Sequence, residues 1–291
     1  MKKILFIINP KAGVSSKLQL PDLIRQIINR EHYEVHIAFT SYKGHAAEMA
    51  RQAVISNFDM VAAAGGDGSV NEVASQLVNT PLTLGVLPIG SGNGLANKLG
   101  IPLDIRQALQ RINRNYRIKI DVGMMNQQTF FSTAGTGFEA LIVHDFARTN
   151  VRGMTGYADK ILRRIFSYHP EVYTIQYNET ESICTKAFML SFGNSGMFGY
   201  GIGLTHREAV MDDGLLEMTL VRDFLRIRAP YLLMMAAEGK ARQLKEVRIE
   251  RVSSAVVSTE KPVLMQIDGE PAPSSSEMHL SVLKQALNVL V

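Results

Sequence analysis

The feature that most constrains this chain is an alternation of two patterns over its first 120 residues. Short, continuous apolar runs, typical of strands buried on both faces, alternate with longer stretches of helical spacing. Strands and helices in alternation predict a parallel sheet with helices on both faces. The runs lie at residues 4–9, 34–40, 59–64 and 83–87, and the helical stretches include residues 21–30, 44–56, 69–78 and 94–99. We therefore predict an N-terminal α/β domain with a doubly wound, mostly parallel sheet.

The pattern changes near residue 119, where short runs become rich in β-branched and aromatic residues and turn residues separate them. Such runs are typical of a mostly antiparallel β domain. They lie at residues 117–122, 129–133, 171–177, 187–194, 215–221, 245–251, 255–258 and 263–267, with helical stretches at 138–169 and 224–238 and a short loop at 272–276. The predicted domains are residues 1–120 and residues 121–291, with the last strand or segment free to return to the first domain.

Composition restricts the class of protein. Of the 291 residues, 46% are hydrophobic and 20% are charged, which is typical of globular and not of disordered chains. Cys184 is the single cysteine, so no internal disulfide forms and a reducing, cytoplasmic location is expected. The N-terminal apolar stretch ends at Asn9, too early for a signal peptide. No window approaches the ~18 uncharged apolar residues of a membrane span, so contact with lipid is expected to be peripheral.

The net charge of +4 and the pI of about 9.1 are mildly basic. This excess suits binding of phosphates or of an anionic membrane surface. Because the basic residues are dispersed along the chain, the sequence does not favour binding of nucleic acid.

Three of the apolar runs lead directly into loops rich in glycine and turn residues. Glycine is needed where the backbone takes a positive φ or approaches a ligand closely, and amides exposed at such turns bind anions. At the carboxyl ends of parallel strands, the three loops together predict a phosphate site. Neither a P-loop nor a dinucleotide fingerprint is present. The loop residues are Asn9, Pro10, Lys11, Ala12 and Gly13; Gly66, Asp67, Gly68, Ser69, Val70, Asn71 and Glu72; and Ser91, Gly92 and Asn93.

Asp67 lies in the middle of the second loop. A carboxylate there would repel phosphate unless Mg²⁺ lay between them, so Asp67 is a candidate metal ligand. The alternative is that Asp67 only caps the local turn. Ser69 and Glu72 match the capping-box pattern S-x-x-E, which predicts a helix that starts at Ser69.

At these residues the sequence resembles the diacylglycerol kinase catalytic family, which also includes sphingoid-base kinases and related bacterial lipid kinases. The resemblance covers nearly the whole chain, and its motifs occur in the family's order. They are Asn-Pro-Lys-Ala-Gly at 9–13, Gly-Gly-Asp-Gly-Ser-Val-Asn-Glu at 65–72, Pro-Ile-Gly-Ser-Gly-Asn-Gly-Leu-Ala at 88–96, Met-Asp-Asp-Gly-Leu-Leu at 211–216 and Ile-Asp-Gly-Glu at 267–270.

The resemblance implies an ATP-dependent kinase that phosphorylates a lipid hydroxyl, with diacylglycerol as the expected acceptor. It implies an N-terminal nucleotide-binding domain, a C-terminal β-sandwich-like domain and an active site in the cleft between them. ATP would be held by residues 9–13, by Thr40, by residues 66–72 and by the third loop with Ser91, Gly92 and Asn93. Glu270 would be the general base. Catalytic Mg²⁺ would be bound with help from Asp67 and Asp121, and a structural Mg²⁺ by the Asp213 side chain and carbonyls near Val210 and Leu215.

One position departs from the family pattern. Many members carry Asn-Asp in the third loop, where this chain has Asn93 and Gly94. The acidic residue is missing, which leaves a sphingoid base open as the acceptor in place of diacylglycerol.

The residues alone leave several roles open. Asp268 and Gly269 read as a tight turn, beside which Glu270 would be an ordinary exposed side chain. Asp121 lies at a strand-to-glycine junction and could equally cap that turn. Asp213 and Gly214 fit a hairpin turn as well as a cation site.

Residues 148–170 mix arginine and lysine with apolar residues at roughly helical spacing. This segment is a candidate membrane-facing helix, and the alternative is a helix packed on its own domain with a solvated basic face. The other functions considered are an NAD kinase, a sugar-phosphate kinase and a non-catalytic nucleotide or lipid sensor. The oligomeric state is left open, with a homodimer as one alternative.

Overall fold

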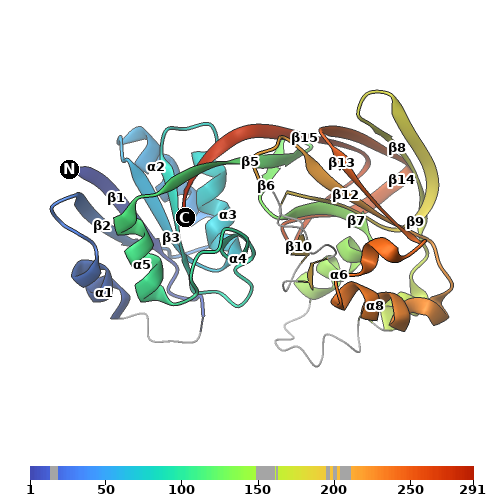
Figure 1. Ribbon diagram of the computed structural model, residues 1–291, viewed down its shortest axis with the longest axis horizontal. Helices are drawn as coiled ribbons and strands as arrows, with labels where there is room; N and C mark the ends of the chain where they lie inside the picture. The colour runs from blue at the N-terminus through green and yellow to red at the C-terminus, as the bar shows by residue number, and fades with distance from the viewer. Residues whose placement is uncertain (14–18, 149–160, 162, 195–196, 199–201, 204–210) are drawn as a thin grey trace. The chain divides into compact units, whose positions relative to one another are not determined.

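The computed structural model describes residues 1–13, 19–148, 161, 163–194, 197–198, 202–203 and 211–291. The chain divides into two compact units, which Figure 1 shows with the chain coloured along its length. The first, called the α/β unit below, consists of Met1–Val122 and Lys284–Val291. The second, called the β unit, is Gly123–Leu283. Two strands, β5 (Arg117–Met125) and β15 (Glu270–Leu290), run from one unit into the other.

The α/β unit is built on a parallel sheet with the strand order β4-β3-β1-β2. The end of β15 adds a further parallel strand beside β4, where Asn288 pairs with Thr83. Every residue of β3 and β4 is buried, as expected for strands covered on both faces. The prediction of a doubly wound parallel sheet is confirmed. The first four strands are β1 (Lys2–Ile8), β2 (Tyr33–Phe39), β3 (Met60–Gly65) and β4 (Thr83–Pro88).

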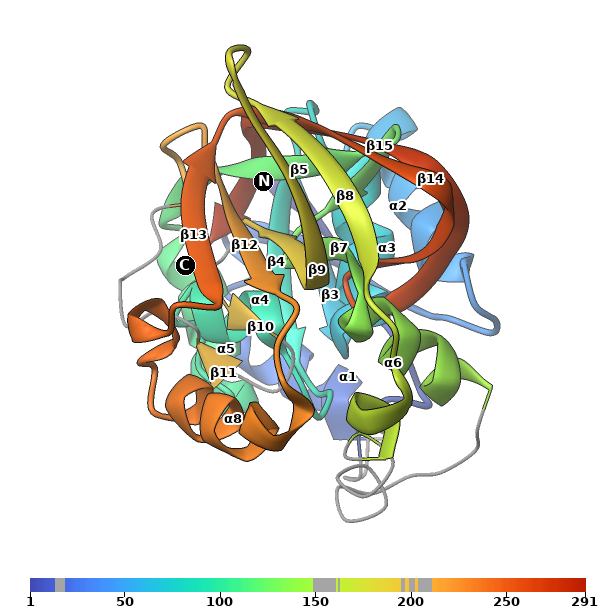
Figure 2. The same ribbon diagram turned by 90° about the vertical axis from the view of Figure 1, so that its right-hand side faces the viewer.

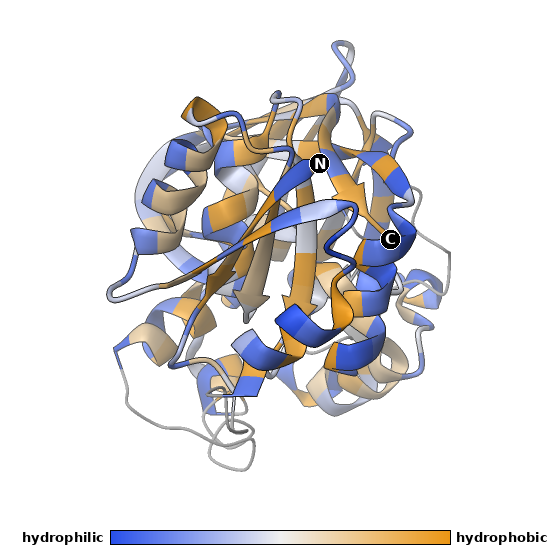
Figure 3. Cartoon of the chain, turned by 90° about the vertical axis from the view of Figure 1, so that its left-hand side faces the viewer, coloured by the Kyte–Doolittle hydropathy of each residue, from blue (hydrophilic) through white to orange (hydrophobic). Residues whose placement is uncertain are grey.

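The helices of this unit pack in two pairs, α1 with α5 and α2 with α3. The pairs lie on opposite sides of the sheet (Figure 1), and hydrophilic and hydrophobic residues alternate along them (Figure 3). The fifth helix was not among the predicted stretches. It begins after Asp104, whose carboxylate accepts the Gln107 amide at 2.9 Å, and it buries Leu109 and Ile112. The bounds are α1 (Leu20–Ile27), α2 (His45–Ile55), α3 (Asp67–Leu77), α4 (Gly94–Lys98) and α5 (Ile105–Arg114).

The β unit is mostly antiparallel, as predicted. Its strand order is β13-β12-β9-β7-β14-β15, and β8 pairs with both β9 and β14 (Figure 2). The remaining strands are β6 (Gln128–Phe130), β7 (Thr133–Gly137), β8 (Glu171–Tyr177), β9 (Glu181–Gly193), β10 (Met197–Phe198), β11 (Ile202–Gly203), β12 (Leu216–Arg222), β13 (Val247–Val252) and β14 (Ser254–Ile267). Its helices include α6 (Phe138–Ala147), η3 (Arg226–Arg228), α8 (Ala229–Ala237) and η4 (Ala241–Gln243), and residues 163–167 are also helical.

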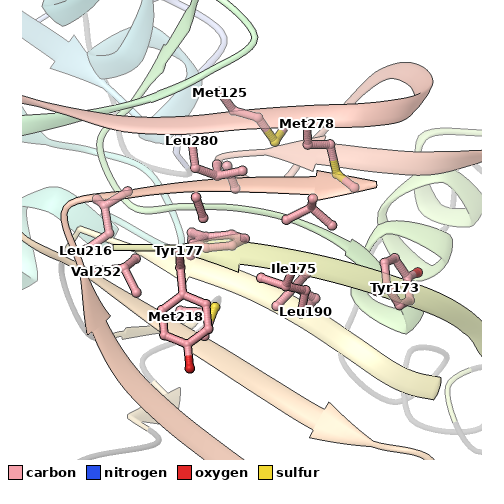
Figure 4. Packing of buried hydrophobic residues seen from close by; sticks show 14 of the residues in the cluster. Met125, Tyr173, Ile175, Tyr177, Leu190, Leu216, Met218, Val252, Met278 and Leu280 are labelled. Atoms are coloured by element: carbon pink, nitrogen blue, oxygen red, sulfur yellow. The ribbon is translucent and has the colours of Figure 1, made fainter. Parts of the chain in front are cut away.

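The main core of the β unit is a cluster drawn from most of its strands, and two smaller clusters lie around its helices. Along β8 buried and exposed residues alternate, so Tyr173, Ile175 and Tyr177 all point inward. Figure 4 shows them packed with Leu190 from β9 and Leu280 from β15. Side chains from strands far apart in sequence thus enclose one core, in keeping with a β-sandwich-like domain.

Two details of the predicted strand pattern are wrong. Residues 272–276, predicted as a loop, lie inside β15, where Ala272 pairs with Met265 and Ser275 with Val263. The runs at 255–258 and 263–267 form a single strand, β14, whose register with β15 shifts between Ser258 and Val263. Proline and serine suggested a turn, but irregular pairing accommodates them in a strand.

Within the described ranges, none of the helices is both long and apolar enough to cross a bilayer.

Candidate active site

The three glycine-rich loops lie side by side in the α/β unit because of the strand order. β1 lies between β2 and β3 in the sheet. The connection from β1 therefore leads to one side of β1 and the connection into β3 to the other side, which makes the boundary between β1 and β3 a topological switch point. Ligands bind at such switch points in open α/β sheets. The parallel ladder continues just past the strands: the Asn9 amide donates to Ala64 O at 2.9 Å, and the Thr40 amide donates to Ile8 O at 2.9 Å. On the next strand, the Ile89 amide donates to Gly65 O at 3.0 Å. The predicted nucleotide-binding loops are therefore neighbours at one sheet edge.

Asn9 joins the first loop to the second. Its side-chain amide donates to Ser69 Oγ at 2.9 Å, while its Oδ1 accepts the Lys11 amide at 2.9 Å. Gly13 closes the first loop with φ of +68°, and a Cβ atom there would lie 2.3 Å from Ile89 O. Only glycine fits so close to the third loop.

The second loop forms the start of α3, but the predicted capping box is wrong. The helix begins at Asp67 with Gly66 as N-cap, two residues before Ser69. Both residues of the expected box bond elsewhere. The Ser69 hydroxyl accepts from Asn9, and the Glu72 carboxylate accepts the Gly44 amide at 2.9 Å and the Ala46 amide at 3.2 Å. Glu72 therefore caps the N-terminus of α2, the helix that follows β2 and Thr40 in the chain.

Asp67 joins the second loop to the third. Its two carboxylate oxygens accept the Asn93 amide at 2.9 Å and the Gly94 amide at 2.6 Å, so it caps α4. Asn93 has φ of +55° and closes the third loop by bonding to both the amide and the carbonyl of Gly90. The structure thus shows the capping role of Asp67 directly. Each carboxylate oxygen keeps a second lone pair, so the half-buried Asp67 still fits a metal ligand, and this role stays a prediction.

The second and third loops touch backbone to backbone. A Cβ atom at Gly90 would lie 2.4 Å from Gly66 Cα, and one at Gly92 would lie 2.5 Å from an oxygen of Asp67. Because the first amides of a helix have no intrahelical acceptor, the N-terminus of α3 beside these glycines suits an anion such as a phosphate.

Asp121 lies on β5 in the same unit and is almost completely buried, with 1% of its surface exposed. Its Oδ1 accepts the Gln285 amide at 2.7 Å and so ties β5 to the end of β15. This contact gives Asp121 a structural role. Its predicted role in binding catalytic Mg²⁺ is not tested by the structure.

Asp213 already has partners in the β unit. One oxygen accepts the Leu215 amide at 3.0 Å, and the other pairs with the guanidinium of Arg251. A cation bound at this carboxylate would have to share it with Arg251, and the predicted role of Asp213 in a structural Mg²⁺ site is not tested by the structure. Of the two residues predicted to supply carbonyl ligands, Leu215 and Val210, the second lies outside the described residues. In the part of the chain that is described, no three acidic, histidine or cysteine side chains gather as a metal site.

Glu270 follows a two-residue hairpin turn between β14 and β15. Asp268 and Gly269 both have positive φ, +49° and +77°, and Ile267 pairs with Glu270 across the turn. The Glu270 side chain is exposed. The turn itself is held firmly, because the Asp268 carboxylate accepts the amides of Phe131, Ser132 and Thr133 at 2.9, 2.7 and 3.1 Å.

A buried carboxyl group beneath this turn was missed by sequence reasoning. Gln266 accepts the Gly269 amide at 2.9 Å and donates its side-chain amide to Glu139, which also accepts the Ser191 hydroxyl at 3.0 Å. Burial raises the pKa of Glu139 to about 7, against the lowering effect of the bonds from Gln266 and Ser191. The only signal in the sequence is an acidic residue within the apolar run of α6.

Comparison with known proteins covers both units. The family model described as the diacylglycerol kinase catalytic domain matches residues 3–125. The model described as the YegS C-terminal NAD kinase beta sandwich-like domain matches residues 132–291, more than half of the chain.

Whole-chain relatives carry related names. The chain is 29% identical over 262 residues to a probable lipid kinase YegS-like of Chromohalobacter salexigens, covering 87% of this chain and 83% of that protein. It is 27% identical over 282 residues to a diacylglycerol kinase of Bacillus subtilis, covering 93% and 90%. A crystal structure of a diacylglycerol kinase from Bacillus anthracis shares the fold, with a TM-score of 0.75 at 20% identity over 99% of this chain and 96% of that one.

The loops at the sheet edge, the β-sandwich-like unit and the two matching models agree with one another. The chain belongs to the diacylglycerol kinase catalytic family of lipid kinases, with a YegS-type C-terminal domain.

Proposed function

We propose that this kinase transfers the γ-phosphoryl group of ATP to a hydroxyl group of diacylglycerol or a closely related lipid. The observation that carries the proposal is the joining of three loops at one sheet edge. Asn9 bonds the first loop to Ser69, and Asp67 bonds the second loop to the Asn93 and Gly94 amides. Such a cradle of amides and a helix N-terminus is suited to a polyphosphate, which a kinase must position before transfer.

The proposed reaction needs one base. Glu270 takes the proton of the lipid hydroxyl as its oxygen attacks the γ-phosphorus; the bond from that phosphorus to the bridging oxygen breaks, and ADP leaves with the electron pair. Glu270 suits this role because its side chain is exposed while the turn before it is fixed by Asp268 and Gln266. Mg²⁺, when bound with ATP, would neutralise phosphate charge. Asp67 and Asp121 are the residues proposed to help hold it.

Two observations bear on the identity of the acceptor lipid: the names of related proteins and the residue at position 94. The Bacillus subtilis relative is named a diacylglycerol kinase, which favours diacylglycerol. A sphingoid base is the second candidate because Gly94 replaces the acidic residue expected in the third loop. The Gly94 amide donates to Asp67 at 2.6 Å, and its lack of a side chain leaves the third loop without the acid common in the family.

A labelling assay tests the proposal. The enzyme is incubated with γ-labelled ATP, Mg²⁺ and a total lipid extract, and parallel reactions contain diacylglycerol, a sphingoid base, NAD or fructose 6-phosphate alone. We expect label in a lipid-phase monophosphate with diacylglycerol as acceptor. Label in NADP or a sugar bisphosphate, or binding of ATP without transfer to any acceptor, would overturn the proposed function.

We also propose that the enzyme works as a peripheral membrane protein in the cytoplasm. A water-insoluble acceptor stays in the bilayer, and the described helices offer no span to anchor the chain. The net charge of +4 is of the sign that anionic lipids attract. A homodimer is a separate proposal, tested by light scattering in solution.

A further inference from the structure

Exposed large apolar side chains are concentrated on one short segment of the β unit. Of the thirteen such side chains among the described residues, five lie within the ten residues 225–234. They are Leu225, Ile227, Tyr231, Leu233 and Met234, exposed to 75, 83, 45, 51 and 50%. Scattered exposed apolar residues are normal, whereas a concentration of this kind marks an interaction site.

Helix α8, which makes up most of this segment, is apolar on both of its sides. One side of α8 is buried through Ala229, Leu232 and Met235. The exposed Tyr231, Leu233 and Met234 are on the remaining surface of the same helix, and every residue of α8 is apolar or aromatic. A helix that is hydrophobic all round is normally buried or in contact with a membrane.

A neighbouring segment extends the exposed surface. Arg226 donates to Tyr168 O at 3.2 Å, and the Phe188 ring contacts both Tyr168 and Phe224, at centroid distances of 5.4 and 4.9 Å. These contacts hold the helical residues 163–167 beside η3, and Phe166 among them is 59% exposed. Figure 2 shows α8 and α6 at the same end of this unit. We call Phe166, Leu225, Ile227, Tyr231, Leu233 and Met234 the apolar patch.

The segment that carries most of the apolar patch is basic in sequence, and four of its basic side chains form ion pairs: Arg226 with Asp223, Arg228 with Glu246, Lys240 with Glu238 and Arg242 with Glu217. Residues 222–246 contain six basic and three acidic residues, a net charge of 6 − 3 = +3, against +4 for all 291 residues. One of the acidic residues, Glu246, is buried and paired with Arg228. The guanidinium of Arg228 also lies 5.9 Å from the centre of the Tyr231 ring. Arginine beside an exposed aromatic ring is typical of surfaces at the boundary between lipid and water.

We propose that the apolar patch docks onto an anionic lipid bilayer, inserting its apolar side chains among the acyl chains while arginines and lysines of the same segment contact acidic headgroups. This inference rests on the proposed function, because an acceptor lipid held in a bilayer requires the enzyme to reach that bilayer. The positive charge favours a membrane over a second copy of this chain, whose patch would carry the same charge. Of the segment predicted to face the membrane, residues 149–160 and 162 lie outside the described residues. Most residues of the apolar patch lie in or beside η3 and α8, so the proposed docking surface consists mainly of these two helices.

Vesicle sedimentation tests the docking directly. The vesicles are phosphatidylcholine alone or phosphatidylcholine with about 30% phosphatidylglycerol. The variant is L225Q combined with I227Q, which changes two highly exposed side chains outside the core. The matched control is I55Q combined with L103Q in the α/β unit, where the native side chains are exposed to 67 and 56%. We expect the full chain to bind the anionic vesicles, the patch variant to bind at least tenfold more weakly, and the control to bind like the wild type.

Activity on two acceptors separates this inference from the proposed function. Long-chain diacylglycerol in anionic vesicles should be phosphorylated at least tenfold more slowly by the patch variant, whereas monomeric dioctanoylglycerol in solution should be phosphorylated at the wild-type rate. If neither the wild type nor any variant phosphorylated either lipid, the proposed function would be overturned. Vesicle sedimentation would still test the docking in that case.

Three results would overturn the docking inference itself. The patch variant could sediment with anionic vesicles as the wild type does. Wild-type binding could be the same with and without phosphatidylglycerol. Light scattering could show a wild-type dimer that the patch variant converts to a monomer, which would assign the patch to contact between two copies.

Discussion

Replacement of Glu139 by glutamine should change the free energy of unfolding by an amount that depends on pH, because the Glu139 carboxyl is buried. The contacts of the Glu139 carboxyl described above come from neutral groups, Ser191 and Gln266. Burial raises its pKa from the usual 4.5 to about 7. Because the folded-state pKa lies above the unfolded one, folded protein holds the proton more tightly, and the carboxyl lowers stability progressively as pH rises from about 4.5 to about 7.

The magnitude follows from the shift. A difference of about 2.5 between the two pKa values, at about 1.4 kcal/mol for each unit, is a loss of about 3.5 kcal/mol, most of which is reached by pH 7.5. Glutamine has the shape of the protonated acid and retains an oxygen for Ser191 and Gln266, so Glu139→Gln removes the loss. Relative to wild type, the variant should therefore gain about 3 kcal/mol between pH 4.5 and pH 7.5.

Urea unfolding followed by far-ultraviolet circular dichroism at several pH values measures this gain. The effects of the other titrating groups cancel in the difference between the two proteins. Glu260→Gln, at an exposed position in β14, serves as the matched control for the same replacement outside the core. A Glu139→Gln difference that is the same at pH 4.5 and at pH 7.5 would refute the reasoning, because burial of a titrating carboxyl would then have no energetic consequence.

The other predictions concern two loops. Asp268→Asn should lower the free energy of unfolding by about 2–3 kcal/mol, measured by urea denaturation, because an amide cannot accept the three main-chain N–H groups that the carboxylate accepts. If its denaturation midpoint matched the wild type, the turn would not depend on that carboxylate. Gly90→Ala should raise the KM for ATP at least tenfold, because its Cβ atom would lie 2.4 Å from Gly66 Cα. Gly100→Ala, with positive φ but open space around it, is the control and should leave that KM unchanged; equal values for both variants would count against the phosphate cradle.

Much of the α/β unit was predictable because its signals are local. The apolar runs at 4–9 and 59–64 became β1 and β3, and glycines at 65, 66 and 90 lie at the end of a strand or just after it, as expected for loops at the sheet edge. From strand order alone, such loops must be neighbours. The type and arrangement of these elements depend on hydrophobic periodicity, which a single sequence records.

Contacts between distant segments were not predictable in the same way. Ser69 and Glu72 have the spacing of a capping box, yet their partners are Asn9 and the start of α2, up to 60 residues away. The carboxyl of Glu139 depends on Gln266, 127 residues later, and nothing in the neighbouring sequence indicates that pairing. Tertiary bonds of this kind override local patterns because each satisfies a buried polar group.

The partners of Asp67 were likewise not predictable from the local sequence. Its place in a glycine-rich turn predicted a metal ligand, with turn capping as the alternative. The structure shows both oxygens accepting amides of the third loop, a partner that only the folded sheet brings close. The metal role stays a prediction, and it now has to be compatible with that capping.

The central claim is that Glu270 accepts the proton of an acceptor hydroxyl during transfer from ATP. The most direct measurement is the rate of phosphoryl transfer to dioctanoylglycerol by Glu270→Gln, together with ATP affinity and circular dichroism of the same variant. We predict a kcat lower by about 10²–10⁴-fold with unchanged ATP affinity and an unchanged spectrum, since a general base typically contributes that factor. Turnover within a few-fold of the wild type would contradict the assignment.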